Sequence, residues 1–117
     1  MIFSVNSSLT AIKAYGVKMG VHADNVANAQ TEEYKKSRAV FKEGLRNDVQ
    51  VEIEQVNTPD PTVAEITDSE RTERELSNVD LAEELPQTIL TQRGLEMNLT
   101  TLKALDEMLG SVIDIVE

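Results

Sequence analysis

The sequence predicts a mainly α fold, in which long N- and C-terminal helices pair as a coiled coil or bundle beside a short β-hairpin or irregular middle segment. Apolar residues recur with heptad spacing near both ends of the 117-residue chain, whereas the middle has a two-residue alternation and two prolines. Aromatic residues make up only 3% of the chain, so aliphatic side chains must form the core, as in interlocking helices. We therefore divide the chain into residues 1–36, 37–76 and 77–117.

The N-terminal helix is predicted by alternating steps of four and three residues, which place side chains along one seam facing another helix. Asn6 or Ser7 is placed to cap its start, and Asn28 lies near its expected end. Gly16 and Gly20 lie inside this helix, where they either allow close approach of a neighbouring backbone or simply weaken it. The predicted seam consists of Val5, Leu9, Ile12, Gly16, Met19, Ala23 and Val26.

The middle segment has a different period. Apolar and polar residues alternate over residues 49–54, which is typical of a strand with one buried face, and residues 39–43 are expected to pair with it as a hairpin. Two prolines within residues 58–61 predict a linker, because proline lacks a backbone donor and restricts the residue before it. Residues 68–75 are dense in both signs of charge, and we expect a solvated turn of helix or loop there.

The strongest helical pattern covers residues 80–116, and its apolar surface is wide enough to predict contact with more than one neighbour. Asp80 has capping-box spacing with the glutamate three residues on, and Ser77 and Asn78 are alternative caps. Pro86 predicts a kink, unless the main helix begins at this proline. The predicted stripe consists of Leu81, Leu85, Leu95, Leu99, Leu102, Leu109, Ile113 and Val116.

Charge and hydropathy exclude several classes of partner. The formal charge of −10, from 21 acidic and 11 basic residues, would repel nucleic acid and anionic bilayers over most of the surface. No apolar run approaches the roughly 20 residues of a membrane helix, so direct membrane insertion is not expected. The N-terminus also lacks the features of a cleaved secretory signal.

The sequence offers little material for catalysis. There is no cysteine, and His22 is the only histidine, so neither a metal site of Cys and His ligands nor a histidine-based nucleophile relay can be assembled within one chain. We interpret His22 as a solvated histidine on a helix face. Glu83 and Glu84, like Asp106 and Glu107, are interpreted as ordinary surface charge. No cofactor and no enzyme activity are expected.

Recognisable motifs lie at both ends. Residues 23–31 read Ala-Asp-Asn-Val-Ala-Asn-Ala-Gln-Thr and are followed by Tyr34 and Lys35. Residues 77–84 and 91–98 read Ser-Asn-Val-Asp-Leu-Ala-Glu-Glu and Thr-Gln-Arg-Gly-Leu-Glu-Met-Asn. In this order they resemble the paired terminal signatures of the flagellar basal-body rod and hook protein family. The residues that match its motifs are Asn25, Asn28, Tyr34, Asn78, Asp80, Gln92, Arg93 and Asn98.

The chain also departs from the family pattern. The N-terminal signature of the family continues Thr-Pro-Gly-Tyr-Lys, whereas this chain has Glu32 and Glu33 in place of the Pro-Gly pair. Pro86 interrupts a helix that is usually free of proline. The middle segment is much shorter than in hook or distal rod members, which points to a small, rod-like member.

The resemblance implies a structural subunit of the flagellar rod and hook, whose terminal helices pair and pack with other subunits. It implies an interhelix or intersubunit role for the seam, stripe and motif residues. The implied partners are other rod and hook subunits, further copies of the chain, and the flagellar export apparatus. The implied location is the periplasm-spanning rod, after export without a cleaved signal. The alternative is a soluble homo-oligomeric coiled-coil adaptor, or a chaperone-like binding module, that uses the same stripes.

Overall fold

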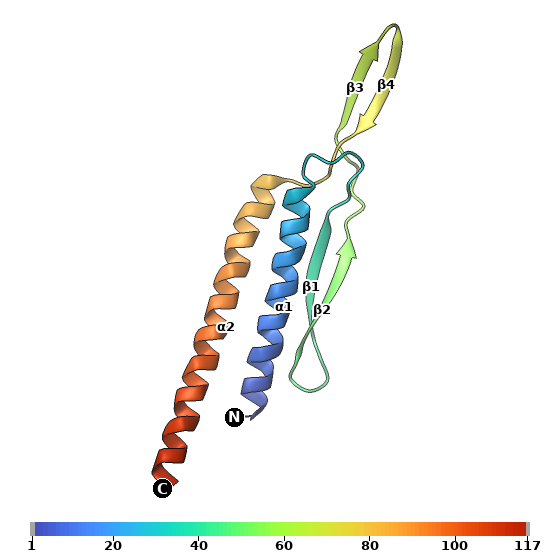
Figure 1. Cartoon of the computed structure of the whole chain (residues 1–117). Helices are drawn as coiled ribbons and strands as arrows, with labels where there is room; N and C mark the ends of the chain where they lie inside the picture. Colours follow the sequence, from blue (N-terminus) through green and yellow to red (C-terminus); the bar gives the residue numbers. More distant parts are fainter. Residues whose placement is uncertain (1, 117) are drawn as a thin grey trace.

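The structure is a computed structural model that describes residues 2–116. Two long helices lie side by side and antiparallel, and the first hairpin of the middle segment lies along the N-terminal helix (Figure 1). The second hairpin projects beyond the end of the helix pair where the N-terminal helix stops and the C-terminal helix starts. The shape is elongated, at 86 × 25 × 14 Å, and the radius of gyration of 21.1 Å far exceeds the roughly 13 Å of a compact domain of this length. In chain order the elements are α1 (Ile2–Ala27), β1 (Ser37–Glu43), β2 (Val49–Gln55), β3 (Thr62–Thr67), β4 (Glu70–Glu75) and α2 (Leu81–Val116).

The prediction of a mainly α fold is wrong. The middle segment forms two separate antiparallel sheets of two strands each, and 23% of the chain is strand. The two terminal helices are present, so the chain combines long helices with hairpins. The error arises because only one of the two hairpins packs against a helix, and the other has no buried face from which a strand period can be recognised.

The β1–β2 hairpin lies where the alternation of apolar and polar residues predicted it. Its strands pair from Ser37 opposite Gln55 to Glu43 opposite Val49. The amide of Gly44 donates to the carbonyl of Asp48 at 2.8 Å, which closes the turn. On the side facing α1, the ring of Phe41 meets that of Tyr15 edge to face, with 5.0 Å between centroids. This aromatic pair fixes the hairpin against the helix.

The β3–β4 hairpin was not predicted, and the expected helical turn or loop at residues 68–75 is wrong. Both strands are exposed along their whole length. Asp68 and Ser69 form a two-residue turn, with φ values of 45° and 78° that match the right-handed twist of a hairpin. Arg74 reaches Glu65 across the strands at 3.5 Å and Glu32 at 3.1 Å. Charge pairs therefore hold this hairpin in place of apolar burial.

The helix α1 begins earlier than its predicted caps. It already includes Ile2, so Asn6 and Ser7 lie inside it and do not cap its start. It ends at Ala27, and the side-chain amide of Asn28 donates to the carbonyl of Asp24 at 2.9 Å. Asn28 therefore lies at the end of the helix, as predicted, and stabilises its last turn.

The helix α2 begins at Leu81 and continues through Pro86, so the alternative start at the proline is wrong. The amide of Ala82 donates to a carboxylate oxygen of Asp80 at 2.9 Å, which makes Asp80 the cap. The carboxylate of Glu83 does not turn back toward this cap as a capping box requires, and it pairs instead with Lys36 at 2.9 Å.

The core of the chain is thin. Among residues 2–116, three apolar side chains are buried, those of Ala14, Val21 and Ala39. The face of α2 toward α1 is polar or small in its first half, where Glu84 and Thr91 are buried. Much of the apolar stripe of α2 is exposed, although Leu99, Leu102 and Leu109 line a groove together with Val5 of α1. Stripe and seam residues that stay exposed are Leu81, Leu85, Leu99, Leu109, Ile113, Val116, Leu9, Gly16 and Ala23, whereas Val5, Ile12, Met19, Val26, Leu95 and Leu102 are half-buried.

The glycines of the two helices differ in what surrounds them. A Cβ atom at Gly16 or Gly20 would meet no atom within 4 Å, so no other part of the described chain approaches them closely. A Cβ atom at Gly94, in contrast, would overlap the ring of Tyr15. Gly94 is therefore the position at which α1 and α2 need a glycine in order to approach each other.

Replacement of this glycine gives a first prediction. Gly94→Ala is expected to lower the free energy of unfolding by about 1 to 3 kcal/mol, because the displaced Tyr15 ring is also packed on Phe41. Gly110→Ala in the same helix is the control, since that site is open, and it should stabilise the chain by up to about 1 kcal/mol. Denaturant titration measures both. Equal midpoints for the wild type and Gly94→Ala would show that the contact is not tight.

Candidate functional site

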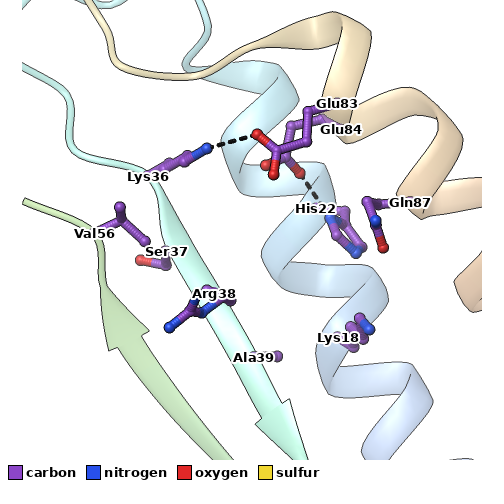
Figure 2. A pocket seen from close by; sticks show the side chains of 10 residues that line it. All are labelled: Lys18, His22, Lys36, Ser37, Arg38, Ala39, Val56, Glu83, Glu84 and Gln87. Carbon is purple, nitrogen blue, oxygen red and sulfur yellow. Dashed lines mark hydrogen bonds and ion pairs between the residues drawn. The ribbon is translucent and has the colours of Figure 1, made fainter. Parts of the chain in front are cut away.

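A buried polar cluster lies where the end of α1, the start of β1 and the first turn of α2 meet. We call His22, Asn25, Tyr34, Ser37 and Glu84 the junction cluster. Its members come from three separate parts of the sequence, and two of them match the family motifs. Figure 2 shows part of this region, with His22 on α1 facing the first turns of α2.

Asn25 is the centre of the junction cluster and is 0% exposed. Its side-chain oxygen accepts from the amide of Ser37 at 3.0 Å and from the phenol of Tyr34 at 3.2 Å. Its side-chain nitrogen donates to the carbonyl of Ser37 at 2.8 Å and to Glu84 Oε1 at 3.2 Å. All four hydrogen-bonding positions of the amide are therefore used, so one residue of α1 fixes both β1 and α2.

Glu84 links this asparagine to His22. Its Oε2 lies 2.7 Å from His22 Nδ1, and the two residues are only 6% and 9% exposed (Figure 2). The interpretations of His22 as a solvated histidine and of Glu84 as surface charge are therefore wrong. Because an ionised carboxylate can only accept, Nδ1 carries the proton in this bond. The buried carboxylate is stabilised by two donors from α1.

Asn78 forms a second polar connection beside the junction cluster. Its side-chain oxygen accepts from the amide of Lys36 at 2.6 Å, and its nitrogen donates to the carbonyl of Val56 at 2.8 Å. Its own amide donates to the carbonyl of Tyr34 at 3.3 Å. Asn78 therefore ties the beginning of β1, the end of β2 and the segment leading into α2 into one joint.

The remaining motif residues do not join this region. Gln92 and Arg93 are exposed on α2, and both contact Glu96, at 3.1 and 2.9 Å. Asn98 donates to the carbonyl of Gly94 within the same helix. The structure thus brings together Asn25, Tyr34 and Asn78, places the helix cap Asp80 and the helix end Asn28 next to them, and leaves Gln92, Arg93 and Asn98 along α2.

The structure indicates a changed pKa for the phenol of Tyr34. Burial, followed by the charges of Asp24 and Glu84, raises the pKa of its phenol above the ordinary value of 10.0. The folded state therefore keeps the proton at pH values where the unfolded chain has lost it. The stabilisation is complete below a pH of about 10 and is lost as the pH rises through the raised pKa.

This shift can be measured by absorbance titration. We expect the near-ultraviolet signal of the native protein to include a phenol that ionises at higher pH than the same phenol in concentrated urea. Tyr34→Phe should remove this late transition and leave that of Tyr15. Identical titration curves for the native and unfolded protein would contradict the prediction.

The junction cluster connects α1, β1 and α2 and does not have the features of a catalytic centre. Within residues 2–116, no hydroxyl forms a hydrogen bond with His22, so the His–Glu pair lacks a nucleophile to activate. No group of three or more possible metal ligands is found in that range. Neither described helix combines the length and apolar character needed to cross a bilayer.

Sequence reasoning missed His22, Ser37 and Glu84 as members of the site. Glu84 lies 59 residues from Asn25 and 62 from His22, so no local pattern indicates that they meet. One signal was present, because Glu84 falls within the segment 77–84 that resembles the family motif. The motif contains Glu84 without indicating its partners, and a glutamate is usually solvated.

Comparison with known proteins agrees with the motif resemblance. Residues 74–115 match the family model described as "Flagellar basal body rod FlgEFG protein C-terminal". The match covers about a third of the chain and includes β4's last residues, Asn78, Glu84 and nearly all of α2. No curated protein matches the chain significantly.

This family consists of structural proteins, and the match indicates a structural role in the flagellar basal body together with other rod components. The resemblance predicted from the terminal motifs is thereby confirmed. Over residues 74–115, which include nearly all of α2, the chain is therefore similar to the C-terminal region of flagellar basal-body rod proteins.

Proposed function

We propose that the chain is a structural subunit of the axial rod or hook structure, and that it assembles through its terminal helices for motility. The observation that supports this most is the exposed apolar face of α2, the same helix that matches the family model. Ile113 is 63% exposed and Ile115 80%. An apolar surface of this length on a chain with such a thin core needs a partner.

The contrast between the buried polar residues and the exposed apolar residues of α2 supports the same proposal. The inward face uses polar residues such as Glu84 and Thr91 to fix the geometry of the subunit. The exposed apolar residues of α2 then remain available for other subunits, including further copies of the chain. Burial of apolar area gives roughly 25 cal/mol for each Å² covered, so such contacts would drive assembly.

Location in the periplasm-spanning rod, and export through the flagellar apparatus without a cleaved signal, complete the proposal. They rest on the family resemblance. The test is to purify basal bodies from cells that carry an epitope-tagged chain, and to delete the gene in a parallel strain. We expect the tagged chain in the rod fraction and loss of swimming in the deletion, restored by the wild-type gene. Normal swimming of the deletion strain, with the tag absent from basal bodies, would overturn the proposal.

A further inference from the structure

A pocket of about 260 Å³ opens between α1, β1 and the first turns of α2, next to the junction cluster (Figure 2). Its lining includes three cations, Lys18, Lys36 and Arg38, and two carboxylates, Glu83 and Glu84. The lining therefore has one formal positive charge in excess, although the whole chain carries −10. Glu54 pairs with Arg38 from outside this lining, so the region is close to neutral and repels an incoming anion less than the acidic remainder of the chain does.

The cations of the pocket are not equally available. Lys36 and Arg38 are each paired with a glutamate, at 2.9 and 3.0 Å. Lys18 forms no ion pair with any residue in the described range 2–116, and its Nζ lies 5.3 Å from the centre of the Phe41 ring. Lys18 is therefore the cation that a further carboxylate would meet.

A second polar group of the pocket also lacks a partner. His22 is one helical turn from Lys18, on the same face of α1, and both line the pocket. Its Nδ1 is bonded to Glu84, whereas its Nε2 is buried without a hydrogen bond to the described residues. A buried nitrogen without a partner is costly, and Nε2 donates to an incoming carboxylate when the ring carries both protons.

The distal part of α2 has the complementary character. Figure 1 shows that α2 extends past the N-terminal end of α1, and its last turn contains no basic residue. This part carries Asp106, Glu107 and Asp114 beside exposed apolar residues such as Met108 and Val112. Glu107 also forms a solvent-exposed pair with Lys103 at 4.0 Å, which contributes little in water. It is therefore an acidic, amphipathic segment whose apolar side is not covered within the chain.

We propose that the pocket binds the carboxylates of Asp106 and Glu107 from a second copy of the chain. Within one copy the contact is excluded, because Glu84 and Asp106 are separated by about 33 Å along α2. Between copies, a head-to-tail arrangement brings the distal α2 of one subunit to the pocket of the next and continues along an axis. The inference rests on the proposed axial role, which requires such stacking.

The test uses a fluorescent peptide with the sequence of residues 101–116 and the full-length chain, with binding followed by anisotropy at low ionic strength. Lys18→Glu should weaken binding about ten-fold. Lys13→Glu is the matched control, an exposed lysine of α1 outside the pocket, and should stay within about two-fold of the wild type. A peptide with Asp106→Lys and Glu107→Lys should prefer the Lys18→Glu chain over the wild type.

Equal binding of the peptide to the wild type and Lys18→Glu, or no binding to either, would overturn the proposal. A failure of the pocket contact can be distinguished from a failure of the proposed axial role. If the chain is found in purified basal bodies but the peptide binds the wild type and Lys18→Glu equally, the structural role stands and the pocket contact is rejected. A chain that is absent from basal bodies loses the structural role, whatever the peptide does.

Discussion

Replacement of Asn25 by aspartate is expected to destabilise the chain by about 3 kcal/mol or more, the largest effect of any single substitution predicted for it. The new carboxylate would be fully buried beside Glu84 Oε1, which lies 3.2 Å from the nitrogen that it replaces. It would also leave the carbonyl of Ser37 without its donor at 2.8 Å. Two like charges and an unpaired acceptor would then occupy the same buried space.

Denaturant unfolding measures this loss, and the chain offers two controls. Asn28→Asp changes an exposed amide, whose side chain bonds to Asp24 and Thr31, and should cost less than about 1 kcal/mol. Adding Glu84→Gln to Asn25→Asp exchanges the amide and the carboxylate across the contact and should recover part of the lost stability. Equal losses at positions 25 and 28 would show that the junction cluster does not hold the elements together.

Replacement of Leu99 by aspartate is expected to abolish incorporation into basal bodies and to change folding stability little. Leu99 is 49% exposed, so a charge there remains partly hydrated in the free subunit. In the assembled structure the same charge would be buried without a partner, at a cost of several kcal/mol. Leu102→Asp should affect both properties, because Leu102 is half-buried in the groove that it shares with Val5 and the more exposed Leu99.

The measurements are the free energy of unfolding of the purified chain, and detection of the tagged variant in basal bodies with a swimming assay. Thr100→Asp is the control for Leu99→Asp, since it adds the same charge at an exposed polar position one residue away. We expect it to assemble. Normal swimming and normal incorporation of Leu99→Asp would contradict an assembly role for this exposed apolar residue of α2.

The two helices and the first hairpin could be predicted because apolar residues recur in their sequences with the period of a helix or a strand. Such a period arises where one face of the element is more apolar than the other. The four-and-three spacing near both termini predicted α1 and α2, and the two-residue alternation predicted β2. The helical periodicity did not show which face meets which neighbour. Apolar spacing suggested that Leu85 and Leu99 would face α1, whereas the buried positions of α2 in the chain are Glu84 and Thr91.

Neither the second hairpin nor the junction cluster could be predicted, and the physical reason differs between the two. The β3–β4 hairpin buries no face, and its Asp68–Ser69 turn lacks the glycine that usually marks a two-residue hairpin turn. The junction cluster depends on contacts between residues that are far apart in sequence, such as His22 and Glu84. A charged residue is usually solvated, and only the tertiary structure shows the partners that allow it to be buried.

One departure from the family pattern has a structural explanation. Glu33 replaces the glycine of the Pro-Gly pair, and its φ of 59° is the left-handed conformation that glycine adopts without strain. The amide of Glu33 donates to the carbonyl of Glu75 at 3.2 Å, which holds the backbone there. Glu33 thus adopts a backbone conformation that a glycine at this position would take without strain.

The free-standing β3–β4 hairpin has a practical consequence for imaging the assembled organelle. The hairpin makes its side-chain contacts near its base, through Arg74 and Glu32, and its tip at Asp68 and Ser69 touches neither helix. Exposed tips of this kind tolerate insertions well. A short peptide tag or a fluorophore at this turn would therefore report the position of each subunit while the joint between the helices stays undisturbed.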